Sequence, residues 1–215
     1  MSSTARGPAR RTPAAPEAGR TGRSGVRAAR HGRRCRRRRG PVVSGASDQR
    51  SSTARALRDH LAGAAPFAET DVRPDGEVVV RVPPDKAVAA AEALAGFQPH
   101  PLNYLSCVSG VDRPDEDQIE VVYTVHSLPG PAKASLRVRV DRKAERPSLP
   151  SLVQVWPAAD YHEREVYDLL GVWFEGHPDL RRILLAETFE GHPLRKDFVQ
   201  NRPPRRRVTR EDYQP

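Results

Sequence analysis

The sequence predicts an α+β fold. We expect a small two-layer domain with the order helix, two strands, helix, three strands in a mixed sheet, followed by a helix and an extended irregular C-terminal arm. Two segments carry apolar residues at helical spacing, and five short segments have the composition or alternation of strands. After Gly171 the chain is broken by Pro and Gly and has no sustained period. This order of elements favours helices packed on one face of the sheet.

The first half of the domain is predicted to be a helix, a hairpin and a second helix. Leu57 and Leu61 lie one helical turn apart, and Gly63 follows as a stop signal. An Arg-Pro-Asp-Gly turn at 73–76 separates two strand candidates. A proline opens the Ala-rich second helix and Gly96 ends it. The expected ranges are helix 53–61, strands 67–72 and 77–82, and helix 85–95.

Three strands are expected in the second half. Residues 102–111 are mostly apolar and end at a turn over 112–115. Two later segments read I-E-V-V-Y-T-V-H and S-L-R-V-R-V, and this alternation is typical of strands with one buried face. They cover 119–126 and 135–140.

A further helix follows an extended, proline-punctuated segment over 147–157. Asp160 and Glu163 have the spacing of a capping box, so we expect Asp160 to be the N-cap. The helix should end at Leu170, and Gly171 is suited to close it. Because Glu163 and Glu165 are two residues apart on this helix, they should point to different faces and make separate ion pairs rather than an acid–base pair.

The formal net charge of +9 comes from the N-terminal segment. Residues 1–50 hold fourteen Arg, no Lys, and only Glu17 and Asp48 as acidic residues, with few large apolar side chains, so we expect this leader to be disordered. Its Arg run at 33–39 leaves open contact with RNA or an anionic membrane surface. The domain organisation expected is a leader at 1–50, an α+β domain at 51–146, a partner-docking helix and arm at 147–200, and a basic tail at 201–215.

Two cysteines limit the chemistry that the chain can perform. Cys35 and Cys107 are too few for a disulfide framework, a four-cysteine zinc site or an iron–sulfur cluster. No stretch has the roughly 18 consecutive apolar residues that a membrane-spanning helix requires. The sequence also contains no phosphate-binding loop, dinucleotide-binding glycine pattern or serine-nucleophile elbow.

The pentapeptide Phe-Glu-Gly-His-Pro occurs twice, at 174–178 and at 189–193. Each histidine precedes a proline and follows a glycine, which predicts that both lie in turns. We therefore expect His177 and His192 to hydrogen-bond backbone or carboxylate groups. A metal hydrolase that uses both histidines with Asp179 is the alternative. A zinc-protease helix is excluded at 162–166, because Val166 occupies the position of the second histidine.

The region after Gly171 holds many large apolar residues for an irregular segment. Such residues are poorly accommodated in water, so the arm either folds back on its own domain or is covered by another protein. We favour the second. The residues expected at a partner interface are Glu163, Arg164, Glu165, Tyr167, Asp168, Trp173, Phe174, His177, Pro178, Arg181, Arg182, His192, Pro193, Leu194, Arg195, Lys196, Asp197 and Phe198.

One part of the sequence resembles a known family. The motif reads WPAADYHEREVYDLLGV at 156–172, FEGHPDLRRIL at 174–184 and GHPLRKDF at 191–198. It is similar to the thirty-kilodalton subunit of the proton-pumping NADH–quinone oxidoreductase (respiratory complex I). Tyr161 stands where the family usually has tryptophan, and Val199 stands where it usually has proline.

The resemblance implies a non-catalytic subunit, peripheral on the cytoplasmic side of a bacterial cell membrane. It implies that this chain binds no cofactor, while the complex uses NADH, FMN, iron–sulfur clusters and quinone. The implied partners are chiefly the quinone-chamber subunit and the subunit that holds the terminal iron–sulfur cluster, and no nucleic acid. The alternative is the equivalent subunit of a related membrane-bound hydrogenase or dehydrogenase complex.

Overall fold

The computed structural model describes residues 44–199. The tail expected at 201–215 and most of the leader expected at 1–50 lie outside the described residues. Residues 44–50 are described, and they belong to the first helix, α1 (Ser44–Ala64), which begins nine residues before the predicted start. The boundary at residue 50 is therefore wrong, because the helix runs through it.

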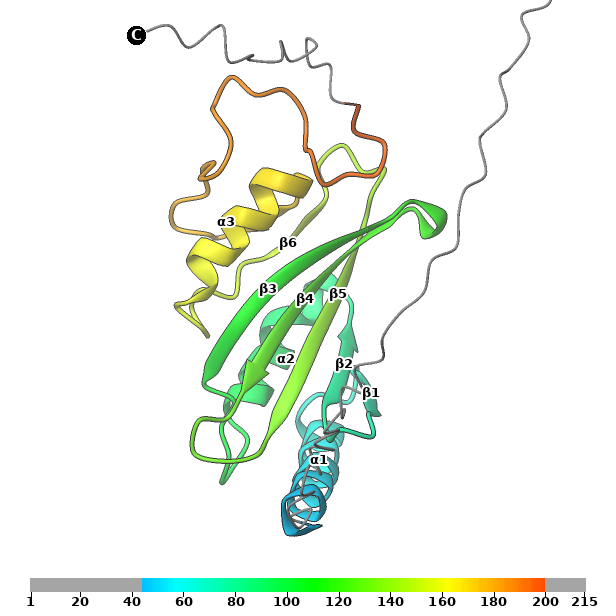
Figure 1. Ribbon diagram of the computed structural model, residues 1–215, viewed down its shortest axis with the longest axis vertical. Coiled ribbons are helices and arrows are strands. Elements are labelled where there is room, and N and C mark those ends of the chain that lie inside the picture. Colours follow the sequence, from blue (N-terminus) through cyan, green and yellow to red (C-terminus); the bar gives the residue numbers. More distant parts are fainter. Residues whose placement is uncertain (1–43, 200–215) are drawn as a thin grey trace, which may run out of the picture. The chain divides into compact units, whose positions relative to one another are not determined.

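Five strands form one mixed sheet, as predicted (Figure 1). Their order across the sheet is β1-β2-β5-β4-β3, and every neighbouring pair is antiparallel except β2 and β5. The third strand continues through Asp112 and Arg113, where a turn was expected, and only a short 3-10 turn at Pro114–Glu116 separates it from the fourth. The strands are β1 (Glu69–Val72), β2 (Val78–Val82), β3 (Tyr104–Arg113), β4 (Gln118–His126) and β5 (Lys133–Asp141).

The helices of residues 44–199 lie on one face of this sheet, which confirms the predicted layering. α2 (Ala87–Ala95) follows a 3-10 turn at Pro84–Lys86, and its buried side chains are three alanines and Leu94, so its backbone can approach the sheet closely. On β4 the alternate residues that face the helices are fully buried, since none of their side chains is exposed. They are Ile119, Val121, Tyr123 and Val125. Within the same residues, the opposite face of the sheet carries no helix.

The third helix, α3 (Ala159–Leu170), connects two short parallel strands. β6 (Ser148–Pro150) lies in the segment predicted to be extended, and β7 (Trp173–Glu175) lies in the arm, where no strand was predicted. Leu149 pairs with Phe174 across them, and both are buried. The arm therefore enters the fold as part of a strand–helix–strand unit before it becomes irregular.

α3 packs against β3 through a glycine. A Cβ atom at Gly110 would collide with the side chain of Leu170 and press against Val166. Since only glycine leaves room there, α3 can lie directly on the strand. This contact fixes the distance between the sheet and the helix from which the arm extends.

We predict that Gly110→Val lowers the free energy of unfolding by about 1–3 kcal/mol, because overpacking forces Leu170 and Val166 to move. Urea unfolding of the full chain measures this. Gly63→Ala in α1 is the control, since nothing lies within 4 Å of a Cβ there, and it should leave stability unchanged or raise it by about 0.5–1 kcal/mol. Equal stability of Gly110→Val and the wild-type chain would contradict the packing of α3 on β3.

Candidate functional site: helix α3 and the C-terminal arm

Three buried carboxylates organise α3 and the arm. Glu163 and Asp168 lie on α3 with fully buried side chains, and Asp112 lies near the end of β3. A buried carboxylate is costly unless its oxygens accept hydrogen bonds. Each of these three accepts several, and each joins segments that are far apart in the sequence.

Glu163 connects α3 to the sheet and to the loop after β6. Its Oε1 accepts hydrogen bonds from the hydroxyl of Tyr123 at 3.1 Å and from the N–H of Leu152 at 2.8 Å, and its Oε2 accepts one from the hydroxyl of Ser151 at 2.6 Å. The capping box is therefore wrong: Ala158 is the N-cap and makes no side-chain capping bond. The ion pair expected for Glu163 is also wrong, because its partners are neutral donors.

The environment of Glu163 changes the acidity of two groups. Burial raises the pKa of Glu163 above its ordinary value, against the opposing effect of the bonds from Ser151, Leu152 and Tyr123. Burial also raises the pKa of the Tyr123 hydroxyl well above its usual value, and the neighbouring charge of Glu163 adds to this. The pair therefore favours protonated forms on both sides of the hydrogen bond.

Asp168 holds the irregular part of the arm. Its Oδ2 accepts hydrogen bonds from three successive backbone N–H groups, those of Ile183, Leu184 and Leu185, at 3.1, 2.8 and 2.9 Å. Arg182 adds a charge contact at 3.7 Å to Oδ1. One carboxylate thus binds a whole turn of a segment that has no secondary structure of its own.

The two histidines of the repeated pentapeptide also hold the arm against α3. His192 Nδ1 lies 3.0 Å from the carbonyl oxygen of Asp168, and His177 Nε2 lies 3.2 Å from that of Asp160. Since a carbonyl only accepts, both ring nitrogens donate. The structural role predicted for the two rings is confirmed. Within the described part of the chain, no three His, Cys, Asp or Glu residues gather as a metal site would require.

Asp112 anchors the far end of the arm to the sheet. It accepts hydrogen bonds from Arg142 at 2.6 and 3.2 Å and from the N–H of Lys196 at 2.7 Å, and Arg142 also pairs with Asp197 at 2.8 Å. Burial acts to raise the pKa of Asp112, but the bonds from Arg142 and Lys196 outweigh it, so the pKa is lowered. Sequence reasoning missed this anchor, since nothing local connects Asp112 with a segment 84 residues away.

The structure separates the predicted interface residues by exposure. Four of them have buried side chains, so they present no surface to a partner and support the arm from inside: Glu163, Arg164, Asp168 and Phe174. The partly buried ones are Tyr167, Trp173, His177, Arg182, His192, Pro193, Arg195 and Phe198. The exposed ones are Glu165, Pro178, Arg181, Leu194, Lys196 and Asp197.

The apolar side chains of the arm divide in the same way. Val172 and Phe174 are buried in the core, which is the alternative that we did not favour. Ile183, Leu184 and Leu194 are 36%, 59% and 52% exposed, although the backbone beside each is hydrogen-bonded to α3. The arm therefore folds back on its own helix and still presents apolar side chains outward.

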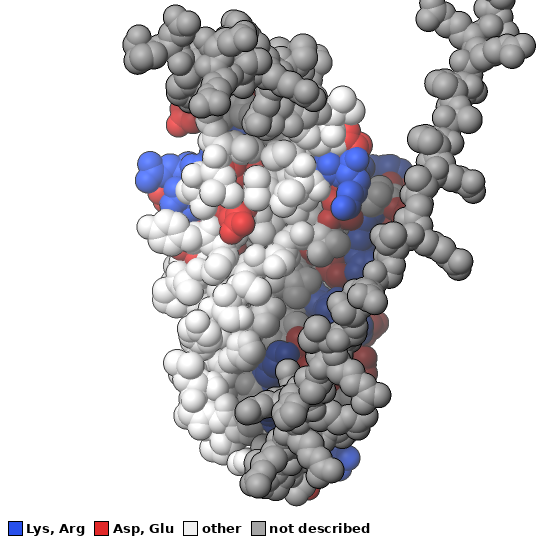
Figure 2. Space-filling model, in the orientation of Figure 1, with Lys and Arg blue, Asp and Glu red and all other residues white. Residues whose placement is uncertain are grey.

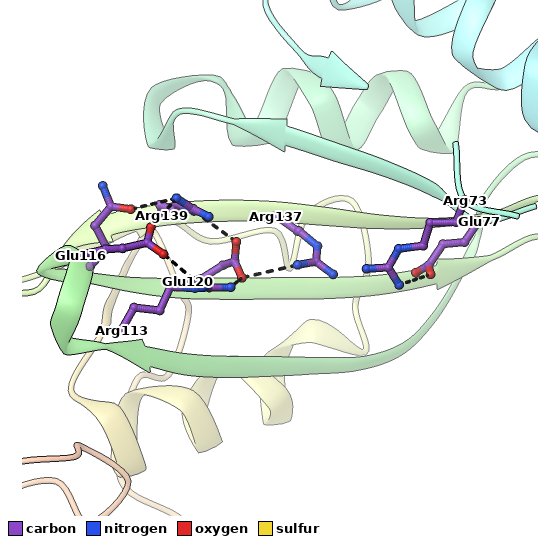
Figure 3. Close-up of polar contacts among 8 residues, drawn as sticks. Arg73, Glu77, Arg113, Glu116, Glu120, Arg137 and Arg139 are labelled. Carbon is purple, nitrogen blue, oxygen red and sulfur yellow. Dashed lines mark hydrogen bonds and ion pairs between the residues drawn. The ribbon is translucent and has the colours of Figure 1, made fainter. Parts of the chain in front are cut away.

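A second feature lies on the sheet face opposite the helices. Glu120, whose side chain is 2% exposed, contacts Arg113 at 2.9 Å, Arg139 at 3.2 Å and Arg137 at 3.5 Å (Figure 3). Burial raises its pKa, but the hydrogen bonds from Arg113 and Arg139 outweigh this and lower the pKa. Charged side chains gather toward one end and one edge of the face seen in Figure 2, and much of the remaining surface is uncharged. No helix in residues 44–199 is long and apolar enough to cross a membrane.

We predict that Asp168→Ala releases the arm. Loss of the acceptor leaves three amides unpaired, so hydrogen exchange at Ile183, Leu184 and Leu185 should accelerate on the order of tenfold or more. Exchange in β4 should not change. Asp179→Ala, which removes an exposed carboxylate of the same arm, is the control. Retained protection at 183–185 in Asp168→Ala would show that the arm is held by other contacts.

We predict that Glu163→Gln changes the pH dependence of stability. Because the folded-state pKa of Glu163 is raised, its contribution is fully present below the ordinary value and is lost as the pH rises through the raised value. Glutamine does not titrate, so the stability of the variant relative to wild type should improve from about pH 4 to about pH 7. Urea unfolding across this range measures the difference. Glu165→Gln, at an exposed position two residues along the same helix, should show no such trend, and a flat difference for both would refute the prediction.

Comparison with known proteins identifies this arrangement of domain, helix and arm. Residues 80–204 match the family described as "Respiratory-chain NADH dehydrogenase, 30 Kd subunit". A subunit of the NADH-quinone oxidoreductase of Moorella thermoacetica is 44% identical over 133 residues, which are 61% of this chain and 87% of the relative. The protein of the same name from a Roseiflexus strain is 42% identical over 143 residues, 66% of this chain and 77% of the relative.

Solved structures include a similar chain. One in the membrane-bound sulfane sulfur reductase, described as an archaeal respiratory membrane complex, superposes with a TM-score of 0.61 at 28% identity, over 70% of this chain and 87% of that chain. The family match covers more than half of the residues and includes α3, both histidine turns and the Arg-Lys-Asp-Phe end of the arm. The chain therefore belongs to the family of the 30 kDa subunit of respiratory-chain NADH dehydrogenase.

Proposed function

We propose that this chain is a non-catalytic assembly subunit in the peripheral arm of a proton-translocating NADH–quinone oxidoreductase. In this role it supports electron transfer from NADH through FMN and iron–sulfur clusters to quinone, all of which are bound by other subunits. Its partners are chiefly the quinone-chamber subunit and the subunit of the terminal iron–sulfur cluster. It lies on the cytoplasmic side of the cell membrane and reaches the membrane through the complex.

One observation carries the proposal: the arm is held rigidly by its own helix while its apolar side chains face outward. Asp168 and Asp112 bind the backbone at residues 183–185 and at Lys196, so the segment between them is fixed at both ends. Leu184 and Leu194 lie within this segment with more than half of each side chain exposed. A segment ordered before binding loses less conformational entropy when a partner covers it.

The buried carboxylates of α3 fit a structural role better than a chemical one. Glu163 and Asp168 spend their hydrogen-bonding capacity on groups of this chain. A general acid or base must instead reach a substrate proton directly or through one water. We therefore divide the chain into an α+β domain at 51–146 and a docking segment at 147–200, with α3 as the support of the second.

The likeness to a chain of the sulfane sulfur reductase favours a second candidate. On this alternative the chain is the equivalent subunit of a related membrane-bound hydrogenase or dehydrogenase complex, with the same docking role. The two are separated by purifying the complex through a tag on this chain. Copurified flavin and NADH-dependent quinone reduction would support the first, whereas activity with another electron donor and none with NADH would support the second.

We predict that the double variant Leu184→Glu with Leu194→Glu lowers incorporation into the complex on the order of tenfold, because charges would replace apolar contacts at the interface. Both sites are exposed, so the free energy of unfolding of the isolated chain should change by less than about 0.5 kcal/mol for each substitution. The amount of tagged chain in the purified membrane complex measures incorporation, with quinone reductase activity expressed per amount of complex.

The control is Leu128→Glu, since Leu128 is 70% exposed between β4 and β5, away from the arm. It should assemble normally. Normal assembly of the double variant would remove the arm from the interface. Loss of activity in a fully assembled complex would instead indicate a direct chemical role.

A further inference from the structure

A solvent-open hollow of about 740 Å³ lies where the end of α3, β7 and the arm meet. Its lining includes an aromatic pair and three arginines contributed by segments that are distant in the sequence. None of the buried carboxylates described above lines it. The residues that matter are Arg146, Tyr167, Trp173, Arg182, His192 and Arg195.

The aromatic part of the lining is fixed. Tyr167 and Trp173 meet edge to face, with ring centroids 5.7 Å apart and an interplanar angle of 85°. The guanidinium of Arg146 lies 3.4 Å from the centroid of the Trp173 ring. Stacking of this kind uses the face of a guanidinium and leaves its in-plane N–H donors available to a ligand.

Backbone geometry keeps the hollow open. Gly171 ends α3 with a φ of +74°, in the left-handed region that favours glycine. A Cβ atom at Gly171 would collide with the ring of His192, whose position is set by its bond to the carbonyl oxygen of Asp168. The closest approach of the arm to α3 therefore requires the absence of a side chain at this point.

The arginines are held in place without being neutralised at the rim. Arg195 Nε donates to the carbonyl oxygen of Leu170 at 2.8 Å, and Arg182 Nη1 donates to that of Phe189 at 2.9 Å. Among the residues that the structure describes, no carboxylate lies within 4.0 Å of the guanidinium of Arg146 or Arg195. Glu145 is the acidic residue of the lining, against three arginines.

We propose that this hollow binds a segment of a neighbouring subunit that presents an Asp or Glu next to an apolar side chain. The carboxylate pairs with the arginines of the rim, which are suited to bidentate carboxylate recognition. The apolar side chain lies against Tyr167 and Trp173. A protein segment is favoured over an anionic lipid, because the hollow continues into the arm that exposes Leu194 beside Arg195.

This inference rests on the proposed function, since it names the chemistry of the partner at one point of the docking segment. It is tested in the purified complex by Arg146→Lys and a water-soluble carbodiimide. The reagent joins an amine to a carboxylate in contact with it and takes up the water that is lost, becoming a urea. Peptide mass spectrometry should find the introduced amine linked to an Asp or Glu of another subunit.

The wild-type chain contains its own control. Lys143 lies in the same loop and its Nζ is 2.6 Å from a carboxylate oxygen of Asp117, so an intrachain Lys143–Asp117 link reports that the reagent works. A link from position 146 only to Glu145, or to the carboxylate of phosphatidylserine, would overturn the proposal. The second of these results would assign the hollow to the membrane surface.

A charge reversal provides an independent measurement. Arg146→Glu should lower the amount of chain in the complex on the order of tenfold, with unchanged thermal unfolding of the isolated chain. Lys143→Glu makes the same charge change outside the hollow and should assemble like wild type. Normal assembly of Arg146→Glu would overturn the inference alone, whereas a wild-type chain that copurifies with no other subunit would overturn the proposed function.

Discussion

The hydrogen bonds from three successive arm amides to the carboxylate of Asp168 are the interaction on which the C-terminal half depends. The arm between β7 and residue 199 has no strand or helix to satisfy its backbone. Hydrogen bonds to a charged group are worth about 1.5–3 kcal/mol each, against about 1–2 kcal/mol of backbone entropy for each ordered residue. One buried carboxylate can therefore order a turn that its own sequence would leave unstructured.

Asp168 can do this only because α3 is itself fixed. Glu163 binds the helix to β4 and to the loop after β6, and Gly110 allows the helix to lie directly on β3. Asp112 then receives the far end of the arm at the end of the same strand. The geometry of the arm thus follows from the sheet through three carboxylates, and none of these contacts connects neighbouring elements of the sequence.

The result is a surface ordered before any partner binds. Leu184 and Leu194 face outward from a fixed backbone, and the hollow at the end of α3 places arginines beside an aromatic pair. Such a combination of apolar side chains and guanidinium groups is typical of protein interfaces. It agrees with membership of the family of the 30 kDa subunit, whose match to this chain includes α3 and the arm.

By itself, the sequence determined the α+β class, the order of the elements and the layering, because hydrophobic alternation and helical spacing are local and visible in windows of a few residues. It also determined that the two Gly-His-Pro turns are structural. Only the tertiary structure decided which carboxylate serves which segment. A capping box was expected at Asp160 and Glu163, but Glu163 turns inward to Tyr123, 40 residues away, and Asp112 binds Lys196, 84 residues away. Burial and partner choice depend on which distant segments meet, and no local pattern records that.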